Sequence, residues 1–447
     1  MKEKKLEAIS PVDGRYRDKV NSISNYFSEK ALIYYRLKVE IEYFLFLCKN
    51  RIGKLKPLNS KKTKILRNIY TDFSMKDAIE IKKIEEKTNH DVKAVEYFIK
   101  KKFDQNKLSD YIEFIHFGLT SQDINNTAIP LSIKEFISNI YIPELDKLIK
   151  HLDKISVKYK DVTIISRTHG QPATPTKLGK EILVFSTRIK NQRKGLVEIP
   201  NSAKFAGAVG NFNAHKVAFP KINWKTFGKK FVESELGLDY SFPTTQIEHY
   251  DSFASLCDNV RRINNILLDL SLDIWTYISL DYFKQKINKD EVGSSAMPHK
   301  VNPIDFENAE GNIGIANSLF DFFSNKLTKS RLQRDLSDST VLRNIGVPFS
   351  HTIISIKSIM KGLDKLIVNK NKINADLEEN WIIISEAIQT ILRREGYQNP
   401  YESLKELTRK NTSITKEILH KFIDSLEVNK KIKNELKVIT PSNYTGV

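Results

Sequence analysis

The longest uninterrupted helical pattern in the chain lies between Pro243 and Gly293, where the sequence has neither glycine nor proline. Apolar residues recur there at intervals of three and four, which is typical of an amphipathic helix. They are Leu256, Val260, Ile263, Leu267, Leu270, Ile274 and Ile278. At 1.5 Å per residue, a helix over most of this span would be about 60–70 Å long. No small domain buries such a rod by itself, so we expect it to lie in a helix bundle that is shared between chains.

Two further stretches show the same periodicity, from about residue 304 to 343 and from about residue 131 to 159. Pro143 is expected to kink the second of them. Glycine and proline gather instead in segments that we interpret as loops at the ends of the long helices. These segments are 167–179, 206–213 and 293–303. The pattern therefore predicts long helices joined by a few loops, which is an all-α fold.

The two ends of the chain carry shorter helical patterns than its middle. The C-terminal amphipathic segments are short and are broken at 396–400 and at Pro441. We therefore expect three domains, namely an N-terminal helical domain (1–111), a central long-helix bundle (112–362) and a C-terminal helical domain (363–447).

The composition is that of an ordinary globular protein with an excess of positive charge. The 447 residues include 72 Lys and Arg against 54 Asp and Glu, which gives a net charge of 72 − 54 = +18. The lysines are scattered along the whole chain, and no arginine-rich arm or basic-aromatic alternation stands out. We interpret the charge as a solvated surface and expect no nucleic-acid partner.

The sequence gives no support for a membrane, secreted or metal-binding protein. No apolar run approaches the roughly 20 residues of a membrane-spanning helix. The first five residues, Met-Lys-Glu-Lys-Lys, lead into no apolar signal region. Cys48 and Cys257 form no CxxC pair and stand in no cysteine–histidine cluster. We therefore expect a cytoplasmic protein with no metal, no cofactor and no membrane partner.

A loop that could carry chemistry follows the longest helical pattern. Its sequence is Gly293-Ser-Ser-Ala-Met-Pro-His-Lys-Val-Asn-Pro303. Lys300 stands six residues after Ser294, so the loop could hold a hydroxyl base beside an ammonium group. By spacing alone, a serine-rich connector between two helices is an equally good interpretation.

The sequence of this loop resembles the GSSxMPxKxNP loop of the fumarase/aspartase superfamily, whose members eliminate fumarate from a substituted succinate. The resemblance implies the all-α, three-domain fold of that superfamily. It also implies that the central long-helix bundle is shared in a homotetramer, with loops from different subunits converging on each active site.

Further segments narrow the resemblance to the adenylosuccinate lyase family, in its longer bacterial form. They are Ser10-Pro-Val-Asp-Gly-Arg-Tyr16, Thr88-Asn-His-Asp-Val-Lys-Ala-Val-Glu96, Phe117-Gly-Leu-Thr-Ser-Gln-Asp123, Arg167-Thr-His-Gly-Gln-Pro-Ala-Thr-Pro175 and Gln333-Arg-Asp-Leu-Ser-Asp-Ser-Thr-Val-Leu-Arg343. The resemblance extends from about residue 8 to residue 444. It departs at Val447, where relatives usually continue for another short helical stretch.

This resemblance implies a β-elimination in purine biosynthesis, the cleavage of adenylosuccinate to AMP and fumarate. The succinyl-aminoimidazole-carboxamide ribotide would be cleaved to AICAR and fumarate in the same way. Such a reaction needs a base, an acid and fixed positive donors for a doubly charged intermediate. Matching positions assign Ser294 as the base, ionised in a cationic setting with Lys300, and His169 as the acid. Glu307 matches the carboxylate that supports this histidine, and an exposed helical glutamate is the alternative interpretation.

The remaining matches are to residues that contact the substrate, whose phosphate and carboxylates require cations and hydroxyl groups. They are Arg15, Tyr16, Asn89, His90, Asp91, Thr120, Ser121, Gln246, Ser295, Lys300, Asn302, Arg334, Ser339 and Arg343. The spacing of Arg334, Ser339 and Arg343 lies close to one helix face, which without the resemblance would more often indicate a solvated surface. His116 and His299 are expected beside the site, and the other histidines are interpreted as structural.

Two other functions are considered. Another lyase of the superfamily, such as an argininosuccinate lyase, would carry the same serine loop, although segments 10–16 and 333–343 favour a nucleotide substrate. A basic RNA-binding or scaffolding protein that has lost catalysis would be expected to lack the polar site residues, and these are present. We therefore predict an enzyme that acts on small-molecule nucleotide substrates and assembles as a homotetramer.

Overall fold

A computed structural model describes residues 5–286, 297, 301–408 and 414–446. The chain forms two compact units, each made of three stretches of sequence. Unit 1 comprises residues 1–145, 192–265 and 311–357, and unit 2 comprises residues 146–191, 266–310 and 358–447. The boundaries between the units fall inside five long helices. These are α9 (Ile142–Lys158), α10 (Leu178–Glu198), α13 (Asp251–Ser279), α14 (Ile304–Leu327) and α16 (Gly346–Lys365). The three domains expected from the sequence stay a prediction.

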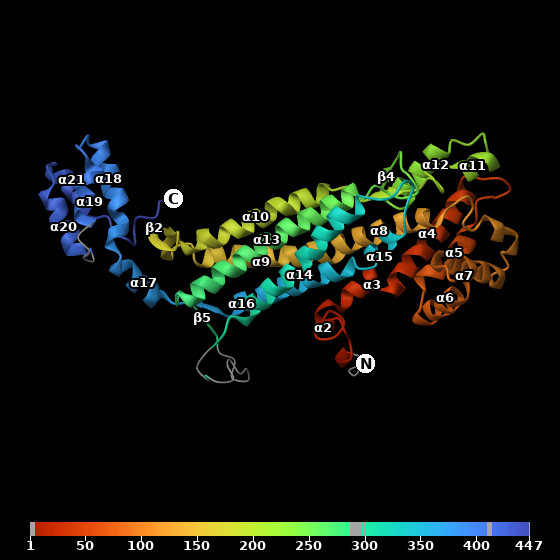
Figure 1. The fold of residues 1–447 in the computed structure, drawn as a ribbon, viewed down its shortest axis with the longest axis horizontal. Helices are drawn as coiled ribbons and strands as arrows, with labels where there is room; N and C mark the ends of the chain where they lie inside the picture. Colours follow the sequence, from red (N-terminus) through yellow and green to blue (C-terminus); the bar gives the residue numbers. More distant parts are fainter. Residues whose placement is uncertain (1–4, 287–296, 298–300, 409–413, 447) are drawn as a thin grey trace. The chain divides into compact units, whose positions relative to one another are not determined.

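In unit 1, helix α4 (Glu29–Lys49) lies at the centre of the core. Most of its length is buried, with Leu37, Val39 and Leu47 fully inaccessible to solvent, and the charged side chains of Arg36, Glu40 and Glu42 are buried as well. Helices α5, α6, α7 and α8 surround it (Figure 1). The other elements of unit 1 are α2 (Arg17–Val20), η1 (Asn21–Ile23), α3 (Ser24–Phe27), α5 (Ser60–Thr71), α6 (Met75–Thr88), α7 (Asp91–Gln105), η2 (Ser109–Phe114), α8 (Ser121–Phe136), η3 (Ile137–Tyr141), β3 (Ser202–Lys204), α11 (Asn213–Ala218), α12 (Trp224–Lys230), η4 (Phe231–Glu235), β4 (Asp239–Ser241) and α15 (Ser337–Leu342).

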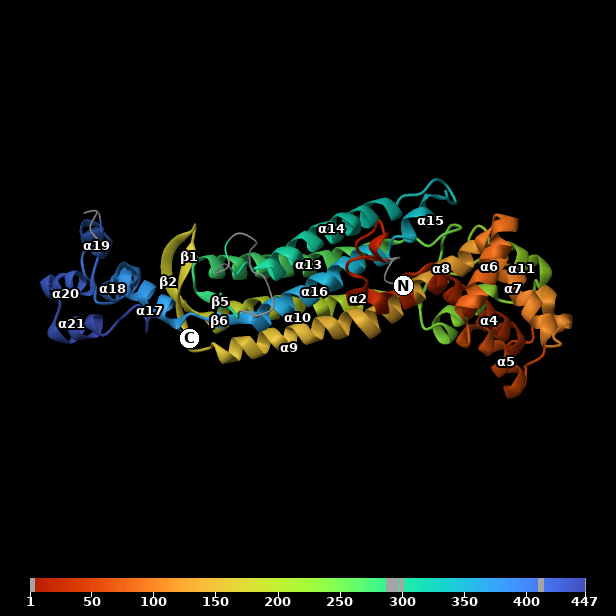
Figure 2. The same ribbon diagram turned by 90° about the horizontal axis from the view of Figure 1, so that it is seen from below.

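Unit 2 combines two antiparallel ribbons with the C-terminal helices. Strand β1 (Thr163–Thr168) pairs with β2 (Gln171–Lys177), and β5 (Phe283–Gln285) pairs with β6 (Leu366–Val368). Figure 2 shows the β1–β2 ribbon standing beside α17, which contacts β1. The remaining elements are α17 (Lys370–Glu379), η5 (Trp381–Ile384), α18 (Ser385–Arg394), α19 (Pro400–Thr408), α20 (Lys416–Ser425) and α21 (Lys430–Lys437). None of the helices described here is long and apolar enough to cross a membrane.

The all-α prediction is confirmed, since helices make up most of the structure, but two of the predicted helices are too long. Helix α13 covers Asp251–Ser279 rather than most of residues 244–292. Tyr250 and Asp281 adopt positive φ angles of 62° and 60°, which interrupt the helix at both ends without glycine or proline. The helix predicted over residues 304–343 likewise ends at Leu327.

The irregularity expected near Pro143 takes the form of a π-helical turn. Helix α8 continues through η3 (Ile137–Tyr141) directly into α9. Pro143 has no backbone N–H to donate to the carbonyl of Asn139, so the preceding turn widens instead of closing in α-helical geometry. The prediction of a loop at 167–179 is wrong, because much of this segment belongs to the paired strands β1 and β2.

His215 is a titratable group in the core of unit 1. It is fully buried, and its Nε2 lies 3.1 Å from the hydroxyl of Tyr43, which itself donates to the carbonyl of Phe117 at 2.8 Å. The imidazole therefore donates from Nε2, and its bare Nδ1 has no hydrogen-bond partner. Gly118 is packed against the ring, since a Cβ there would lie 2.8 Å from it.

Acid is therefore expected to destabilise this core through His215. Burial lowers its pKa to about 4, with nearby Lys204 acting in the same direction and Asp123 opposing it. The neutral folded form contributes stability that is complete above the unfolded pKa of about 6.5 and is lost as the pH falls toward 4. Between pH 7.5 and 4.5 this amounts to roughly 2.5 kcal/mol.

Urea unfolding at these two pH values measures the effect. In His215→Gln, the loss of stability between pH 7.5 and 4.5 should be smaller than in the unmodified protein by about that amount. His249→Gln, at an exposed histidine, is the matched control and should leave the pH dependence unchanged. An identical pH dependence in His215→Gln would contradict the assignment.

Candidate active site

His169 lies at the tip of the β1–β2 ribbon in unit 2. Thr168 pairs with Gln171, so His169 and Gly170 form a two-residue turn in which both φ angles are positive, at 54° and 76°. Turns of this kind match the twist of two antiparallel strands. Arg167 Nη1 donates to the Gly170 carbonyl at 3.3 Å, and His169 itself is exposed. The candidate acid is thus presented outward at the end of a ribbon.

Glu307 lies in the first turn of α14, also in unit 2. Its Oε1 accepts a hydrogen bond from the indole Nε1 of Trp275 on α13 at 3.1 Å. Within the part of the chain that the structure describes, no hydrogen bond or ion pair joins Glu307 to His169. The expected support of His169 by this carboxylate stays a prediction.

The described residues on either side of the serine loop are held by other elements of unit 2. The predicted residues Ser294, Ser295 and Lys300 lie outside the described residues, as does His299, whereas Asn302 follows them and is half-buried. Before the loop, the backbone N–H of Lys286 donates to the carbonyl of Lys365 at 2.8 Å. After it, the carbonyl of Val301 accepts from Gln285 Nε2 at 3.0 Å. The neighbouring strand β5 and the end of α16 therefore hold both entry and exit.

In unit 1, the turn between α6 and α7 contains three of the predicted residues. Asn89 ends α6 in the left-handed conformation, with φ of 48°. His90 is the N-cap of α7, where its Nδ1 accepts the backbone N–H of Lys93 at 3.1 Å. Because Nδ1 accepts, the neutral ring carries its proton on Nε2, and its side chain is 51% exposed. His90 thus offers a donor to solvent or to a ligand.

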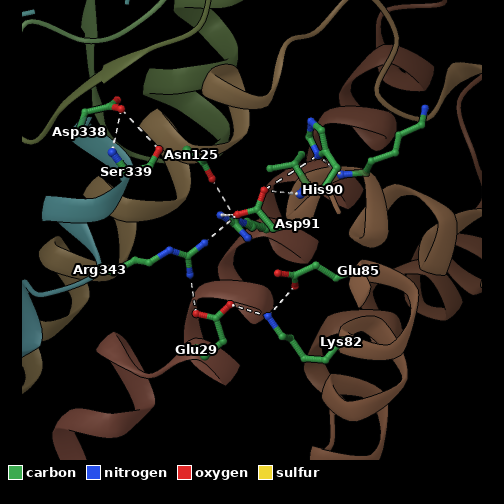
Figure 3. A network of polar contacts seen from close by, with 12 residues as sticks. Glu29, Lys82, Glu85, His90, Asp91, Asn125, Asp338, Ser339 and Arg343 are labelled. Atoms are coloured by element: carbon green, nitrogen blue, oxygen red, sulfur yellow. Dashed lines mark hydrogen bonds and ion pairs between the residues drawn. The ribbon is translucent and has the colours of Figure 1, made fainter. Parts of the chain in front are cut away.

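Asp91, the first residue of α7, faces inward instead. Its Oδ2 accepts from Arg36 Nη2 at 2.7 Å and from Arg343 Nη2 at 2.9 Å, and its Oδ1 accepts the Val92 N–H at 2.8 Å (Figure 3). Arg36 is almost fully buried and also donates through Nε to Asn125 on α8 at 2.9 Å. Burial alone would raise the pKa of Asp91, but Arg36, with help from Arg343, holds it below the usual value. With both oxygens engaged, Asp91 positions Arg343.

Arg343 caps the end of α15 and bridges to a second carboxylate. Its Nη1 donates to Glu29 Oε2, on the first turn of α4, at 2.7 Å. The other oxygen of Glu29 lies 3.5 Å from Lys82 Nζ, which pairs more closely with Glu85 at 2.7 Å. Figure 3 shows this chain of alternating charges running from Arg343 to Glu85.

Arg334 and Ser339 are joined directly. Arg334 Nη2 donates to Ser339 Oγ at 2.7 Å, although the two residues flank the start of α15. The buried carboxylate of Asp338 pairs with Arg334 and accepts the backbone N–H of Ser339 at 2.7 Å. Three predicted substrate contacts, Arg334, Ser339 and Arg343, therefore lie on or beside one short helix.

Thr120 and Ser121 form the N-terminus of α8, where backbone N–H groups favour an anion. Asp123 fixes this turn, because its Oδ2 accepts the Thr120 N–H at 2.8 Å. Its Oδ1 accepts from Lys204 Nζ at 2.8 Å and from the backbone N–H groups of 206–207 at 2.9 and 3.0 Å. Both charged side chains are fully buried. One ion pair thus joins the Thr120 turn to the loop after β3.

Two further predicted contacts lie on other segments of unit 1. Gln246 donates through Nε2 to the carbonyl of Ala208 at 3.0 Å, in the same loop after β3. Arg15 is exposed, and its guanidinium carbon lies 6.0 Å from the centre of the Tyr16 ring. Neither contact links these residues to the Arg343 network.

A cavity of about 80 Å³ in unit 1 borders the same residues. Its polar lining includes Glu29, Arg36, Gln122, Asn125, Ser339 and Arg343. Side chains from α4 and α8, and residues on or just after α15, therefore line one partly open pocket. Among the described residues, no group of three or more His, Cys, Asp or Glu side chains could hold a metal ion.

Sequence reasoning missed the partners of the predicted residues. Glu29 holds Arg343 in place, and Arg36 holds Asp91. Asp338 likewise holds Ser339, and Trp275 holds Glu307. No signal in the sequence singled out Arg36, because α4 also carries Lys38, Glu40 and Glu42 among its apolar positions.

Two family profiles match the chain in succession. A profile described as "Lyase" matches residues 14–316, and one described as "Adenylosuccinate lyase C-terminal" matches residues 330–445. Proteins named adenylosuccinate lyase are 57% identical in Dictyostelium discoideum over 453 aligned residues and 45% identical in Escherichia coli (strain K12) over 443. Each alignment covers 99% of this chain and 97% of the relative.

Solved structures of low sequence identity share the fold. A fumarate lyase from Mesorhizobium sp. BNC1 superposes with a TM-score of 0.74 at 16% identity, covering 95% of both chains. A 3-carboxy-cis,cis-muconate lactonizing enzyme from Pseudomonas putida gives a TM-score of 0.73 at 16% identity, covering 95% of this chain and 94% of its own. The all-α fold inferred from the serine-loop resemblance is confirmed, whereas the three domains and the homotetramer stay predictions.

Proposed function

The chain belongs to the adenylosuccinate lyase family, and we propose that Ser294 and His169 carry out its reaction, the elimination of fumarate from adenylosuccinate to leave AMP. The same residues would release AICAR and fumarate from the succinyl-aminoimidazole-carboxamide ribotide. The observation that carries this proposal is the identity of 45–57% to adenylosuccinate lyases over 99% of the chain. The match of residues 330–445 to the adenylosuccinate lyase C-terminal profile favours a nucleotide substrate over that of an argininosuccinate lyase.

The elimination needs a base at the carbon-bound proton and an acid at the departing nitrogen. We assign the base to Ser294, whose hydroxyl is ionised by a cationic setting that includes Lys300. His169 suits the acid because imidazole titrates near neutral pH, and its exposed position on the ribbon tip leaves it accessible to a substrate. The negative charge that develops on the succinyl carboxylate would be stabilised by Thr120 and Ser121 at the N-terminus of α8.

The phosphate end of the substrate is proposed to bind at α15. Arg343 and Arg334 supply guanidinium groups, and Ser339 supplies a hydroxyl, on or beside one short helix. Guanidinium groups bind phosphate oxygens through paired, charge-assisted hydrogen bonds. His90 Nε2 would add a neutral donor from the facing turn.

We also propose that the chain assembles as a homotetramer in the cytoplasm. The long helices leave large apolar side chains uncovered within this chain, including Leu183 and Val184 on α10, Leu272 on α13, and Ile315 and Phe322 on α14, each between 42% and 50% exposed. Apolar surface repeated along several neighbouring helices is typical of an interface between subunits.

Incubation with adenylosuccinate tests the proposed function. In buffer containing EDTA, the purified protein should change the purine absorbance as AMP appears, because the reaction is expected to need no metal. Fumarate should be released in equal amount and is measured separately. A folded protein that produces neither AMP nor fumarate at micromolar concentration would refute the proposal.

A further inference from the structure

Asp91 and Glu29, the two carboxylates that pair with Arg343, are held in place very differently. Asp91 is fixed, because the buried Arg36 and the backbone N–H of Val92 bond it from the protein side. Glu29 has no such anchor among the described residues. Its contacts are to Arg343, at 2.7 Å, and to Lys82, at 3.5 Å, and its side chain is 41% exposed. Arg343 therefore has one permanent partner and one exchangeable partner.

The Glu29–Arg343 pair is also the easier one to separate. Both side chains are 41% exposed, and water solvates the partners of an exposed ion pair almost as well as they solvate each other. Arg36, by contrast, is 3% exposed. If Asp91 moved away from it, the buried positive charge of Arg36 would lose its carboxylate partner, which is costly. A competing anion that reaches Arg343 would displace Glu29 and leave Asp91 in place.

The charged side chains linked to Arg343 have no net charge in total. Arg36, Lys82 and Arg343 contribute three positive charges, and Glu29, Glu85 and Asp91 contribute three negative ones. Arg334, beside Ser339, is likewise paired, with Asp338. A phosphate dianion approaching Arg343 thus meets a guanidinium group that is already paired with two carboxylates, one of which must be displaced. Lys82 lies within reach to receive the displaced carboxylate (Figure 3).

We propose that Glu29 is the exchangeable counter-ion of Arg343, whose place on Nη1 is taken by the phosphate of the bound nucleotide while Glu29 turns to Lys82. This inference rests on the proposed function, which assigns Arg343 to the phosphate. Glu29 then acts as a specificity-determining residue. Because any ligand must outcompete a resident carboxylate, singly charged or weakly held anions are rejected, and a phosphate monoester with further contacts is admitted.

Glu29→Gln tests the proposal, since it removes the charge and keeps the size of the side chain. We expect the dissociation constants of AMP and of inorganic phosphate, measured by isothermal titration calorimetry, to fall about five- to tenfold, because neither ligand then displaces a charge from Arg343. Adenosine, which lacks the phosphate, should bind equally to both proteins. Glu80→Gln is the matched control, because Glu80 lies on the same helix as Lys82 but pairs with Lys101, and its AMP affinity should stay within twofold.

A second variant tests the other half of the exchange. Lys82→Met removes the cation that receives Glu29 and should weaken AMP binding several-fold. If Glu29→Gln bound AMP and phosphate with unchanged or lower affinity, with thermal unfolding showing a folded protein, Glu29 would be a positioning residue for Arg343 and the proposal would be overturned. Absence of adenylosuccinate cleavage by the unmodified protein would instead refute the proposed function, so the two failures are distinguishable.

Discussion

Replacing Ser294 with alanine is expected to lower kcat for adenylosuccinate by a factor of roughly 10²–10⁴, the usual contribution of a catalytic base. The phosphate and carboxylate contacts remain, so the dissociation constant of the substrate should change little. Deleting a base removes an interaction made in the transition state and leaves the binding of the ground state intact.

Steady-state kinetics and calorimetric titration of the inactive variant with substrate separate these effects. Ser425→Ala, at an exposed serine whose hydroxyl donates to the Phe422 carbonyl within its own helix α20, is the control and should keep full activity. If Ser294→Ala retained more than about a tenth of kcat, a loss of under ~1.4 kcal/mol, Ser294 would not be the base.

Mixing two inactive variants is expected to restore activity. If Ser294 and His169 of one active site come from different chains, Ser294→Ala and His169→Ala should complement when they are unfolded and refolded together. With random assembly, a site receives an intact serine loop half of the time and an intact histidine ribbon half of the time. About a quarter of full activity should therefore return.

The matched control for this experiment combines Ser294→Ala with Lys300→Met. Both residues lie in the same loop, so every loop in the mixture carries a defect and no activity should return. Activity of the refolded mixtures is compared with that of unmodified protein treated in the same way. If the Ser294→Ala and His169→Ala mixture formed tetramers and stayed inactive, each site would be built within one chain.

The periodicity of the sequence predicted that the long helices exist, and failed at their ends. Helix α14 stops at Leu327 without a glycine or proline to stop it. The segment that follows is held by its own polar side chains, since Asp335 pairs with Arg331 and accepts from the backbone N–H of Ser337 at 2.8 Å. Such local contacts compete with the helix, and their geometry cannot be read from a pattern of apolar positions.

The β1–β2 ribbon was missed for a related reason. Its tip has the sequence His169-Gly170, and the register places only these two residues between Thr168 and Gln171. Glycine and proline around it predicted a loop, whereas the two positive φ angles at the tip make a tight turn between strands. A strand of six or seven residues is too short for its alternation to stand out.

The candidate site was predicted as a set of motif residues without the groups that hold them. Arg334, Ser339 and Arg343 matched a family motif, but Glu29 and Arg36 lie in α4, some 300 residues earlier in the chain. From the sequence alone, a charged residue in a helical pattern is interpreted as exposed on the surface, because its partner becomes known only from the tertiary structure. Neither Arg36, which holds Asp91 in place, nor Glu29, the exchangeable partner of Arg343, could be found from sequence spacing.

The buried pair of Asp123 and Lys204 restricts how this sequence can vary. The two positions are 81 residues apart, yet replacing either one alone would leave an uncompensated charge in the core of unit 1. Either single substitution would therefore destabilise the protein, so positions 123 and 204 are expected to change together in evolution. The carboxylate of Asp123 also fixes the Thr120 turn and the loop after β3. A substitution at position 204 would therefore disturb the N-terminus of α8 as well. Lys204 is thus subject to the same constraint as the proposed substrate contacts Thr120 and Ser121.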